Sequence, residues 1–213
     1  MLRGLGAETV PLRCAGDLHP TPPLDGLVFP GGESSTMAIL LDALAMADPL
    51  RALIAGGTPA FGTCAGAILL SDEVVGKGAP AASVHLGGLD VATRRNGYGS
   101  QIHSFAADTE WLPAAPPPAP APPADGGGGK AAAPSGPLRV VLIRAPVFER
   151  LGAGVEVLVA HEGQAVMVRG GARRQVLAAT FHPELTGDNR VHALFLGMVD
   201  ERRRRLAVGG GGA

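Results

Sequence analysis

Residues 58–70, TPAFGTCAGAILL, decide the fold of this chain. Residues 58–61 are typical of a short apolar strand, and residues 62–66 form a tight turn with a glycine at each end. An apolar helix is expected to begin at Ala65 and to continue to Leu70. A buried strand that passes through a glycine turn into a helix is the repeating unit of α/β domains.

The same order of elements occurs upstream, in residues 24–35, LDGLVFPGGESS. Here a short strand is ended by Pro30 and a pair of glycines, and Ser34 or Ser35 can cap a following helix. A second short helix is expected over residues 48–57, with proline in its first turn. Two strand–turn–helix units in succession predict a largely parallel sheet.

The remainder of the chain adds further predicted elements. Strands are expected at residues 86–93, 99–104, 138–143, 155–160, 165–169 and 176–181, and a final helix at residues 189–205. The predicted fold class is therefore α/β, with three layers and a mostly parallel sheet flanked by helices, as in flavodoxin-like folds.

Glycine and proline are unusually frequent in this chain of 213 residues, with 32 and 19 copies respectively. Many of them lie in residues 113–137, a Pro/Ala/Gly-rich tract, and in residues 209–213. A tract of this composition buries too little apolar surface to offset its ordering entropy. We therefore expect one domain over residues 1–208, a disordered insertion at 113–137 and a flexible tail at 209–213.

Charge and hydropathy narrow the class of protein. The formal net charge is −1, and the basic cluster at residues 202–205 is typical of a solvated helix end, so we expect no nucleic-acid partner. No apolar run is long enough to span a bilayer, and residues 1–13 contain no apolar signal segment. The two cysteines form no disulfide framework. We expect a cytoplasmic protein with no membrane contact, no metal and no cofactor.

Cys64 is the first candidate for chemistry. It lies between Gly62 and Gly66, directly after a predicted strand and at the start of a predicted helix. A nucleophile elbow has this arrangement, because the sharp turn exposes the side chain and the flanking glycines relieve crowding. The alternative is a buried structural cysteine, which is one of the commonest core residues.

A nucleophilic cysteine needs a base and a group that orients the base. His182 directly follows the predicted strand at 176–181, and the end of a parallel strand is where α/β folds place their sites. Glu184 lies two positions further, in a stretch that Pro183 keeps extended, and is expected on the same side. These residues suggest a Cys–His–Glu triad, although a chance position for His182 stays open. The remaining histidines are interpreted as ordinary surface residues: His19, His85, His103, His161 and His192.

The third candidate is the turn at residues 31–35, GGESS. A glycine turn that leads into a helix N-terminus can present backbone N–H groups to a developing oxyanion. Taken alone, this segment is better explained as a plain strand-to-helix turn with a serine cap.

Together these segments resemble the class I-like glutamine amidotransferases, and among them the glutaminase subunits of pyridoxal 5′-phosphate synthase. The resemblance covers nearly the whole chain apart from the insertion and the tail. It is carried by five segments: residues 29–37 (FPGGESSTM), 61–66 (FGTCAG), 95–101 (RNGYGSQ), 143–146 (IRAP) and 181–185 (FHPEL).

The resemblance implies hydrolysis of glutamine to glutamate and ammonia. Cys64 would be the nucleophile, His182 the general base and then acid, and Glu184 the residue that orients His182. The backbone N–H groups of Gly32 and Ala65 would form the oxyanion hole. Glutamine would be held by residues at six positions: Gly32, Glu33, Ser34, Arg95, Ile143 and Arg144. The ammonia would pass to a barrel-shaped synthase subunit in a hetero-oligomeric complex that makes pyridoxal 5′-phosphate.

The chain departs from the family pattern at its start. Family members begin with a strand and a helix, whereas residues 1–6, MLRGLG, resemble the end of that helix, so we expect the domain to be N-terminally incomplete and to lack the first strand. An alternative hypothesis is therefore a truncated, non-catalytic remnant that neither docks nor folds fully. A cysteine hydrolase similar to stress proteins shares the elbow, but it would not explain the residues around His182.

Overall fold

The computed structural model describes residues 1–76, 85–97, 104–112 and 136–209. Its central sheet has five strands in the order β1-β2-β10-β9-β8. Their bounds are Leu27–Phe29 for β1, Ala60–Thr63 for β2, Val176–Ala179 for β10, Gln164–Gly170 for β9 and Glu156–His161 for β8. Strands β1, β2 and β10 are parallel, and β9 and β8 continue the sheet in antiparallel pairs.

Two smaller sheets accompany the central one. The first has the order β3-β4-β7, with bounds Ser71–Val75, Leu89–Arg94 and Val147–Leu151. The second pairs β5 (Phe105–Thr109) with β6 (Leu138–Leu142). The α-helices are α1 (Ser34–Ala43), α2 (Ala47–Ala55), α3 (Ala65–Leu70) and α4 (Arg190–Gly209), and three short 3-10 helices are η1 (Leu2–Leu5), η2 (Ala15–Leu18) and η3 (Pro183–Leu185).

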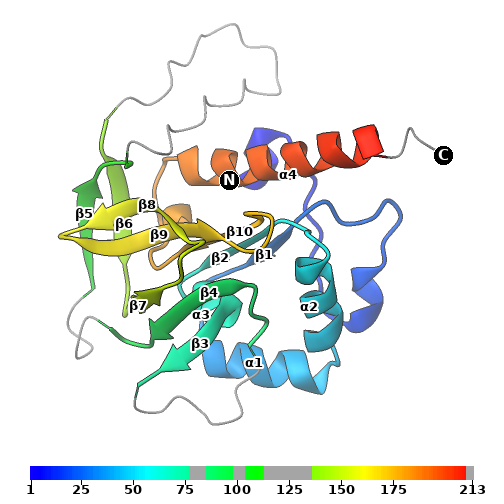
Figure 1. Ribbon diagram of the computed structural model, residues 1–213, viewed down its shortest axis with the longest axis horizontal. Helices are drawn as coiled ribbons and strands as arrows, with labels where there is room; N and C mark the ends of the chain where they lie inside the picture. Colours follow the sequence, from blue (N-terminus) through cyan, green and yellow to red (C-terminus); the bar gives the residue numbers. More distant parts are fainter. Residues whose placement is uncertain (77–84, 98–103, 113–135, 210–213) are drawn as a thin grey trace, which may run out of the picture.

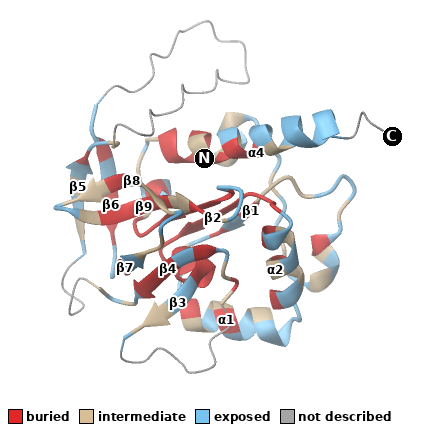
Figure 2. Ribbon diagram, viewed as in Figure 1, coloured by how far each residue is buried: buried red, intermediate tan, exposed pale blue. Residues whose placement is uncertain are grey.

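Side chains alternate between the two faces of the parallel strands and divide the core in two. Leu27, Ala60 and Ala178 belong to one cluster of buried residues, which also includes residues of α1, α2 and α3. Phe61 and Leu177 belong to the other cluster, which includes the apolar side of α4. This period-two pattern is expected of a sheet covered on both faces. Figure 1 shows α4 on one side of the central sheet and α1 to α3 on the other, and Figure 2 shows that burial is concentrated between these layers.

The predicted α/β class with a sheet between helix layers is confirmed. Within the central sheet, parallel pairing is confined to β1, β2 and β10, the strands next to Cys64 and His182, and β3 also pairs with β4 in parallel in a smaller sheet. The strand predicted at 176–181 ends at Ala179, and β3, β5 and β7 were not predicted. Most of the expected strand at 99–104, residues 113–135 of the expected insertion and residues 210–213 of the expected tail lie outside the described residues. Within the described part of the chain, no helix is both long enough and apolar enough to cross a membrane.

Candidate active site

Cys64 occupies the sharp turn between β2 and α3. Its backbone has φ 48° and ψ −103°, a left-handed φ that non-glycine residues rarely adopt. The side chain is buried, with 8% of its surface exposed. Strain of this kind is found at nucleophile elbows, where it holds the nucleophile at the end of a strand.

The two glycines that flank the cysteine are required by close backbone packing. A β-carbon at Gly62 would lie 2.5 Å from the carbonyl carbon and oxygen of Gly66. A β-carbon at Gly66 would lie 2.0 Å from the carbonyl oxygen of Phe29, on the neighbouring strand β1. Real β-carbons do not approach other atoms so closely, so any side chain at either position would push α3 away from the sheet.

The pairing of β2 with β10 brings the histidine to the cysteine. Thr63 is opposite Ala179 in the parallel register, and the Cys64 N–H donates to the Ala179 carbonyl oxygen at 2.8 Å. His182 is three residues beyond Ala179, and its own N–H donates to the Val141 carbonyl oxygen at 2.9 Å. Cys64 is near enough to His182 to be the largest cause that raises the pKa of the imidazole.

The imidazole is oriented by the carboxylate two residues further along the chain. Nδ1 of His182 is 2.8 Å from Oε1 of Glu184, within the short turn η3. A carboxylate only accepts hydrogen bonds, so Nδ1 carries the proton and Nε2 remains available to the thiol. The side chain of His182 is 13% exposed and that of Glu184 is 39% exposed, so the pair is partly screened by solvent.

Hydrogen bonds within this group shift the pKa of His182 and the pKa of Glu184. The hydrogen bond with Cys64, followed by that with Glu184, raises the pKa of His182 to about 9. Burial alone would raise the pKa of Glu184, but its hydrogen bond with His182 and the attraction of that ring bring the pKa below its ordinary value. The arrangement therefore favours an imidazolium next to a carboxylate at neutral pH.

The glycine turn after β1 lies directly against the histidine ring. A β-carbon at Gly31 would come within 2.4 Å of Cε1 of His182. Gly32 has φ +151°, a conformation that side chains disfavour. The turn predicted as an oxyanion candidate thus borders the same imidazole that Cys64 reaches, and Ala65 follows Cys64 at the first position of α3.

Glu33 and Arg95 join two loops beside this turn. The Arg95 guanidinium donates to Oε1 of Glu33 at 2.9 Å, which connects the turn after β1 with the loop after β4. Ser34 is buried, with 7% of its surface exposed. Hydrogen bonds from the N–H groups of Thr36 and Ser35 lower the pKa of Glu33 to about 2.

Ile143 and Arg144 lie in the turn between β6 and β7. Ile143 is 39% exposed, and Arg144 has a left-handed φ of 44°. This turn is next to the loop that carries Arg95, because the Gly97 N–H donates to the Ala145 carbonyl oxygen at 3.0 Å. The structure thus places the predicted residues at the ends of β1, β2, β4, β6 and β10.

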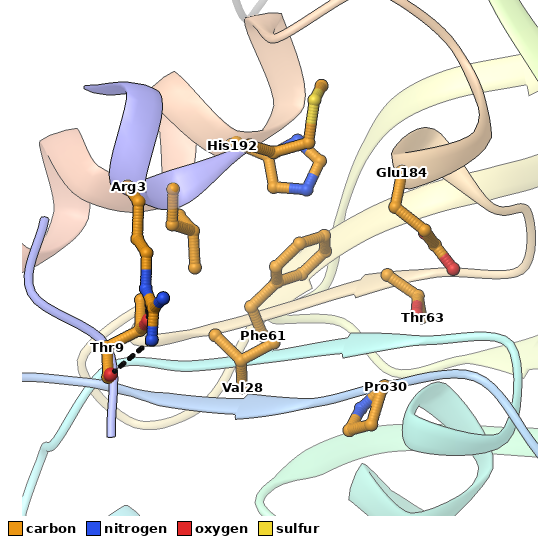
Figure 3. A pocket seen from close by; sticks show the side chains of 10 residues that line it. Arg3, Thr9, Val28, Pro30, Phe61, Thr63, Glu184 and His192 are labelled. Atoms are coloured by element: carbon orange, nitrogen blue, oxygen red, sulfur yellow. Dashed lines mark hydrogen bonds between the residues drawn. The ribbon is translucent and has the colours of Figure 1, made fainter. Parts of the chain in front are cut away.

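A pocket of about 350 Å³ opens beside the Cys–His–Glu group (Figure 3). Glu184 and Thr63 line it, together with residues of η1, β1 and α4, whereas neither Cys64 nor His182 does. Within the described part of the chain, β1 is the outer strand of the central sheet, and Val28 on it is 43% exposed. The pocket therefore lies next to Glu184 of the Cys–His–Glu group and along the outer edge of β1.

His192 was predicted to be an ordinary surface residue, and this was wrong. It is 6% exposed, its ring meets that of Phe61 edge-on with centroids 5.9 Å apart, and its Nδ1 is buried with no hydrogen-bond partner. Burial is the largest cause that lowers the pKa of His192. Positions 192, 195 and 199 follow the spacing of one helix face, so its place next to Phe195 and Val199 could have predicted burial.

No group of three or more His, Cys, Asp or Glu residues is placed to hold a metal ion in the ranges that the structure describes. The polar groups of the candidate site are one thiol, one imidazole, carboxylates and guanidinium groups. This set suits attack on a carbonyl carbon with proton transfer through the imidazole.

Comparison with known proteins gives consistent matches. The model of the SNO glutamine amidotransferase family matches residues 7–116 and 131–201. The chain is 44% identical over 199 residues to the pyridoxal 5′-phosphate synthase subunit PdxT of Mycobacterium avium, covering 93% of this chain and 87% of that protein. It is 43% identical to the PdxT subunit of Nocardia farcinica over 203 residues, covering 93% and 78%. A solved structure described as a glutamine amidotransferase superposes with a TM-score of 0.74 at 38% identity, covering 93% and 90%.

Proposed function

The chain belongs to the SNO glutamine amidotransferase family, and from this premise we propose that it hydrolyses glutamine to glutamate and ammonia. The observation that carries the proposal is the assembly of Cys64, His182 and Glu184: Cys64 is the largest influence on the pKa of an imidazole whose Nδ1 is held 2.8 Å from the carboxylate.

In the proposed mechanism, His182 already holds the proton of the Cys64 thiol when Sγ attacks the side-chain amide carbon of glutamine. The carbonyl oxygen becomes an oxyanion, and we assign its stabilisation to the backbone N–H groups of Gly32 and Ala65. The tetrahedral intermediate then breaks its C–N bond, His182 returns the proton to the nitrogen, and ammonia leaves. Glu184 keeps the imidazole in the correct tautomer throughout.

Water completes the reaction in a second step. His182 takes a proton from a water molecule, the hydroxyl oxygen attacks the thioester carbon, and the C–S bond breaks to release glutamate and restore the thiol of Cys64. The balanced reaction is glutamine plus water to glutamate plus ammonia. No redox partner or metal enters either step.

We propose that glutamine is held between two walls of the site. The turn that contains Gly32, Glu33 and Ser34 forms one wall. Arg95, Ile143 and Arg144 form the other, where the two guanidinium groups suit the α-carboxylate of an amino acid substrate.

The named relatives are subunits of pyridoxal 5′-phosphate synthase. We propose that this chain likewise passes its ammonia to a barrel-shaped synthase subunit in a hetero-oligomeric complex for pyridoxal 5′-phosphate synthesis. The alternative of a non-catalytic remnant is not favoured, because the sequence matches PdxT subunits at 43–44% identity and the candidate residues lie together.

The test is glutamate release by the purified chain, alone and mixed with the synthase subunit of the same organism. We expect activity that rises on adding the synthase subunit and that Cys64→Ala abolishes. Cys14→Ala is the matched control, because the second cysteine is exposed and distant in the chain from the elbow. Glutamate release by the Cys64→Ala protein would overturn the proposed mechanism.

A further inference from the structure

The first residue of α4 is an arginine that is almost fully withdrawn from solvent. The side chain of Arg190 is 3% exposed, and that of Asp188, its ion-pair partner, is 15% exposed. Nε of Arg190 lies 3.0 and 2.9 Å from the two carboxylate oxygens of Asp188, and Nη2 donates to Oδ2 at 2.5 Å. A charge buried so deeply is costly unless it is both paired and hydrogen-bonded. The pair with Asp188 supplies the opposite charge and leaves further guanidinium N–H groups for other partners.

These remaining donors of Arg190 join α4 to a distant part of the chain. Nη1 donates to the Gly136 carbonyl oxygen at 2.9 Å, and Nη2 donates to the Pro137 carbonyl oxygen at 2.9 Å. Gly136 and Pro137 lead directly into β6, which begins at Leu138. A single guanidinium group therefore connects the start of α4 with the start of β6, across 53 and 54 positions of sequence.

Strand β6 is also the strand against which the candidate catalytic segment lies. The His182 N–H donates to the Val141 carbonyl oxygen of β6 at 2.9 Å, and η3 contacts the same strand. Strand β6 is held along its whole length by antiparallel pairing with β5. The segment between β10 and α4, residues 180–189, has only the short turn η3 as regular structure. Arg190 therefore ties the far end of this segment to β6, in addition to the contact between His182 and Val141.

Local hydrogen bonds connect Arg190 with the turn that carries Glu184. The Arg190 N–H donates to Oδ1 of Asp188 at 3.0 Å, and the Asp188 N–H donates to the Thr186 hydroxyl oxygen at 3.3 Å. The Thr186 hydroxyl in turn donates to the Pro183 carbonyl oxygen at 3.0 Å, within η3. Glu184 is the middle residue of η3. A shift of Asp188 would therefore be passed on to the turn that carries Glu184.

We propose that Arg190 is a positioning residue, which together with Asp188 holds the segment after β10 against β6 and so keeps the Glu184 carboxylate on Nδ1 of His182. The inference rests on the proposed glutaminase function, because that function makes the geometry of Glu184 and His182 matter for a rate. It adds to the Cys–His–Glu group a residue that acts through Glu184.

The role requires the shape of arginine as well as its charge. The planar guanidinium group binds one carboxylate and two carbonyl oxygens at once, whereas the ammonium group of lysine lacks this fixed fork of donors. Burial alone would raise the pKa of Asp188, but hydrogen bonds from Arg190 bring that pKa below its ordinary value. The pair therefore stays ionised at neutral pH, and Arg190→Lys tests the geometry of the contact with the positive charge retained.

The pKa of His182 reports whether Glu184 stays in place, and NMR titration of the chain alone measures it without any substrate. We expect Arg190→Lys to lower this pKa, because the hydrogen bond with Glu184 contributes to its rise after that with Cys64. Arg169→Lys is the matched control and should leave the pKa unchanged. Arg169 forms another shielded ion pair, with Glu156, at 21% and 16% exposure, and this pair joins β9 to β8. A wild-type pKa of His182 in folded Arg190→Lys would overturn the proposal.

Thr186→Val decides the question if Arg190→Lys does not fold. It leaves the pair of Arg190 and Asp188 intact and breaks the hydrogen bonds that connect this pair with η3. We expect a lower pKa of His182 and a kcat that falls about two- to tenfold, the effect of losing one neutral hydrogen bond. In that case, a wild-type pKa together with a wild-type kcat in Thr186→Val would overturn the proposal.

Kinetics in the complex with the synthase subunit separate positioning from a purely structural role. We expect Arg190→Lys to lower kcat for glutamine hydrolysis about 10- to 100-fold, as for a misplaced reacting group, with KM changed about twofold or less. A purely structural role would lower the melting temperature and leave both kcat and the pKa of His182 at their wild-type values, which would overturn the proposal. A wild-type chain that releases no glutamate, while Arg190→Lys still lowers the pKa of His182, would overturn the proposed function and leave the positioning of Glu184 intact.

Discussion

Gly31 and His182 are in such close contact that a β-carbon at Gly31 would lie 2.4 Å from Cε1 of the imidazole. The turn after β1 and the ring after β10 come from opposite ends of the sequence, yet each fixes the position of the other. A methyl group at position 31 can be accommodated only if the ring or the turn moves, and both carry groups of the proposed mechanism.

Gly31→Ala is therefore expected to lower kcat for glutamine hydrolysis by about 10²-fold, the effect of a misplacement near 1 Å at a reacting group. The measurement is steady-state glutamate release together with a thermal melt. Gly154→Ala is the matched control, since a β-carbon there meets nothing within 4 Å. Wild-type kcat in Gly31→Ala would show that the contact places no constraint on catalysis.

The pKa of His182 provides a second prediction. NMR titration of the imidazole should give a pKa of about 9 in the wild type, and a lower pKa in Cys64→Ser and in Glu184→Gln. The decrease should be larger for Cys64→Ser, because the hydrogen bond with Cys64 is the largest cause of the rise. A titration near 6.5 in the wild type would contradict the charge arrangement described for the site.

The same shift predicts how stability depends on pH. A histidine whose pKa is higher in the folded state than in the unfolded state stabilises the fold fully below the unfolded pKa of 6.5. This stabilisation is lost as pH rises toward about 9. The free energy of unfolding of the wild type minus that of His182→Gln, from denaturant melts, should therefore decline between pH 6.5 and 9. A difference that grows with pH would contradict the sign.

Local sequence signals were sufficient to locate most of the site. Cys64 and the flanking glycines are explained by one turn, and His182 with Glu184 by the end of one strand. The residues alone did not predict which segments would lie next to one another in space. The register that sets Thr63 opposite Ala179 joins segments far apart in sequence, and so does the hydrogen bond from the His182 N–H to the Val141 carbonyl oxygen.

Other features depend on packing that a local pattern does not encode. Strands β9 and β8 form the antiparallel half of the sheet, and their sequences contain the same kinds of apolar runs as those of the parallel strands. The contact between Glu33 and Arg95 could not be predicted from a local pattern, because Arg95 lies in a loop 62 positions away. Burial of His192 was missed because its residue type, rather than its helical position, was given weight.

The contact between Gly66 and Phe29 predicts a stability effect. A methyl group at Gly66 would meet backbone atoms on β1, which cannot rotate away, so Gly66→Ala should lower the free energy of unfolding by about 2 kcal/mol or more. Gly197→Ala is the matched control in α4, where a β-carbon meets nothing within 4 Å. It should raise stability by about 0.5–1 kcal/mol through helix propensity. Equal effects in denaturant melts would argue against the tight packing of α3 on β1.

His192 gives the last prediction, and its sign is opposite to that for His182. Burial, as the largest cause, lowers the pKa of His192, so its protonation is disfavoured in the folded state, and stability should fall as pH drops below the unfolded pKa of 6.5. His192→Leu removes this dependence together with the buried Nδ1 that has no partner, and it should stabilise the protein at neutral pH by about 1 kcal/mol. Denaturant melts of both proteins from pH 5 to 8 measure this, with His19→Leu as control at an exposed histidine. If the curves for wild type and His192→Leu stay parallel below pH 6.5, the ring is not held neutral by burial against Phe61.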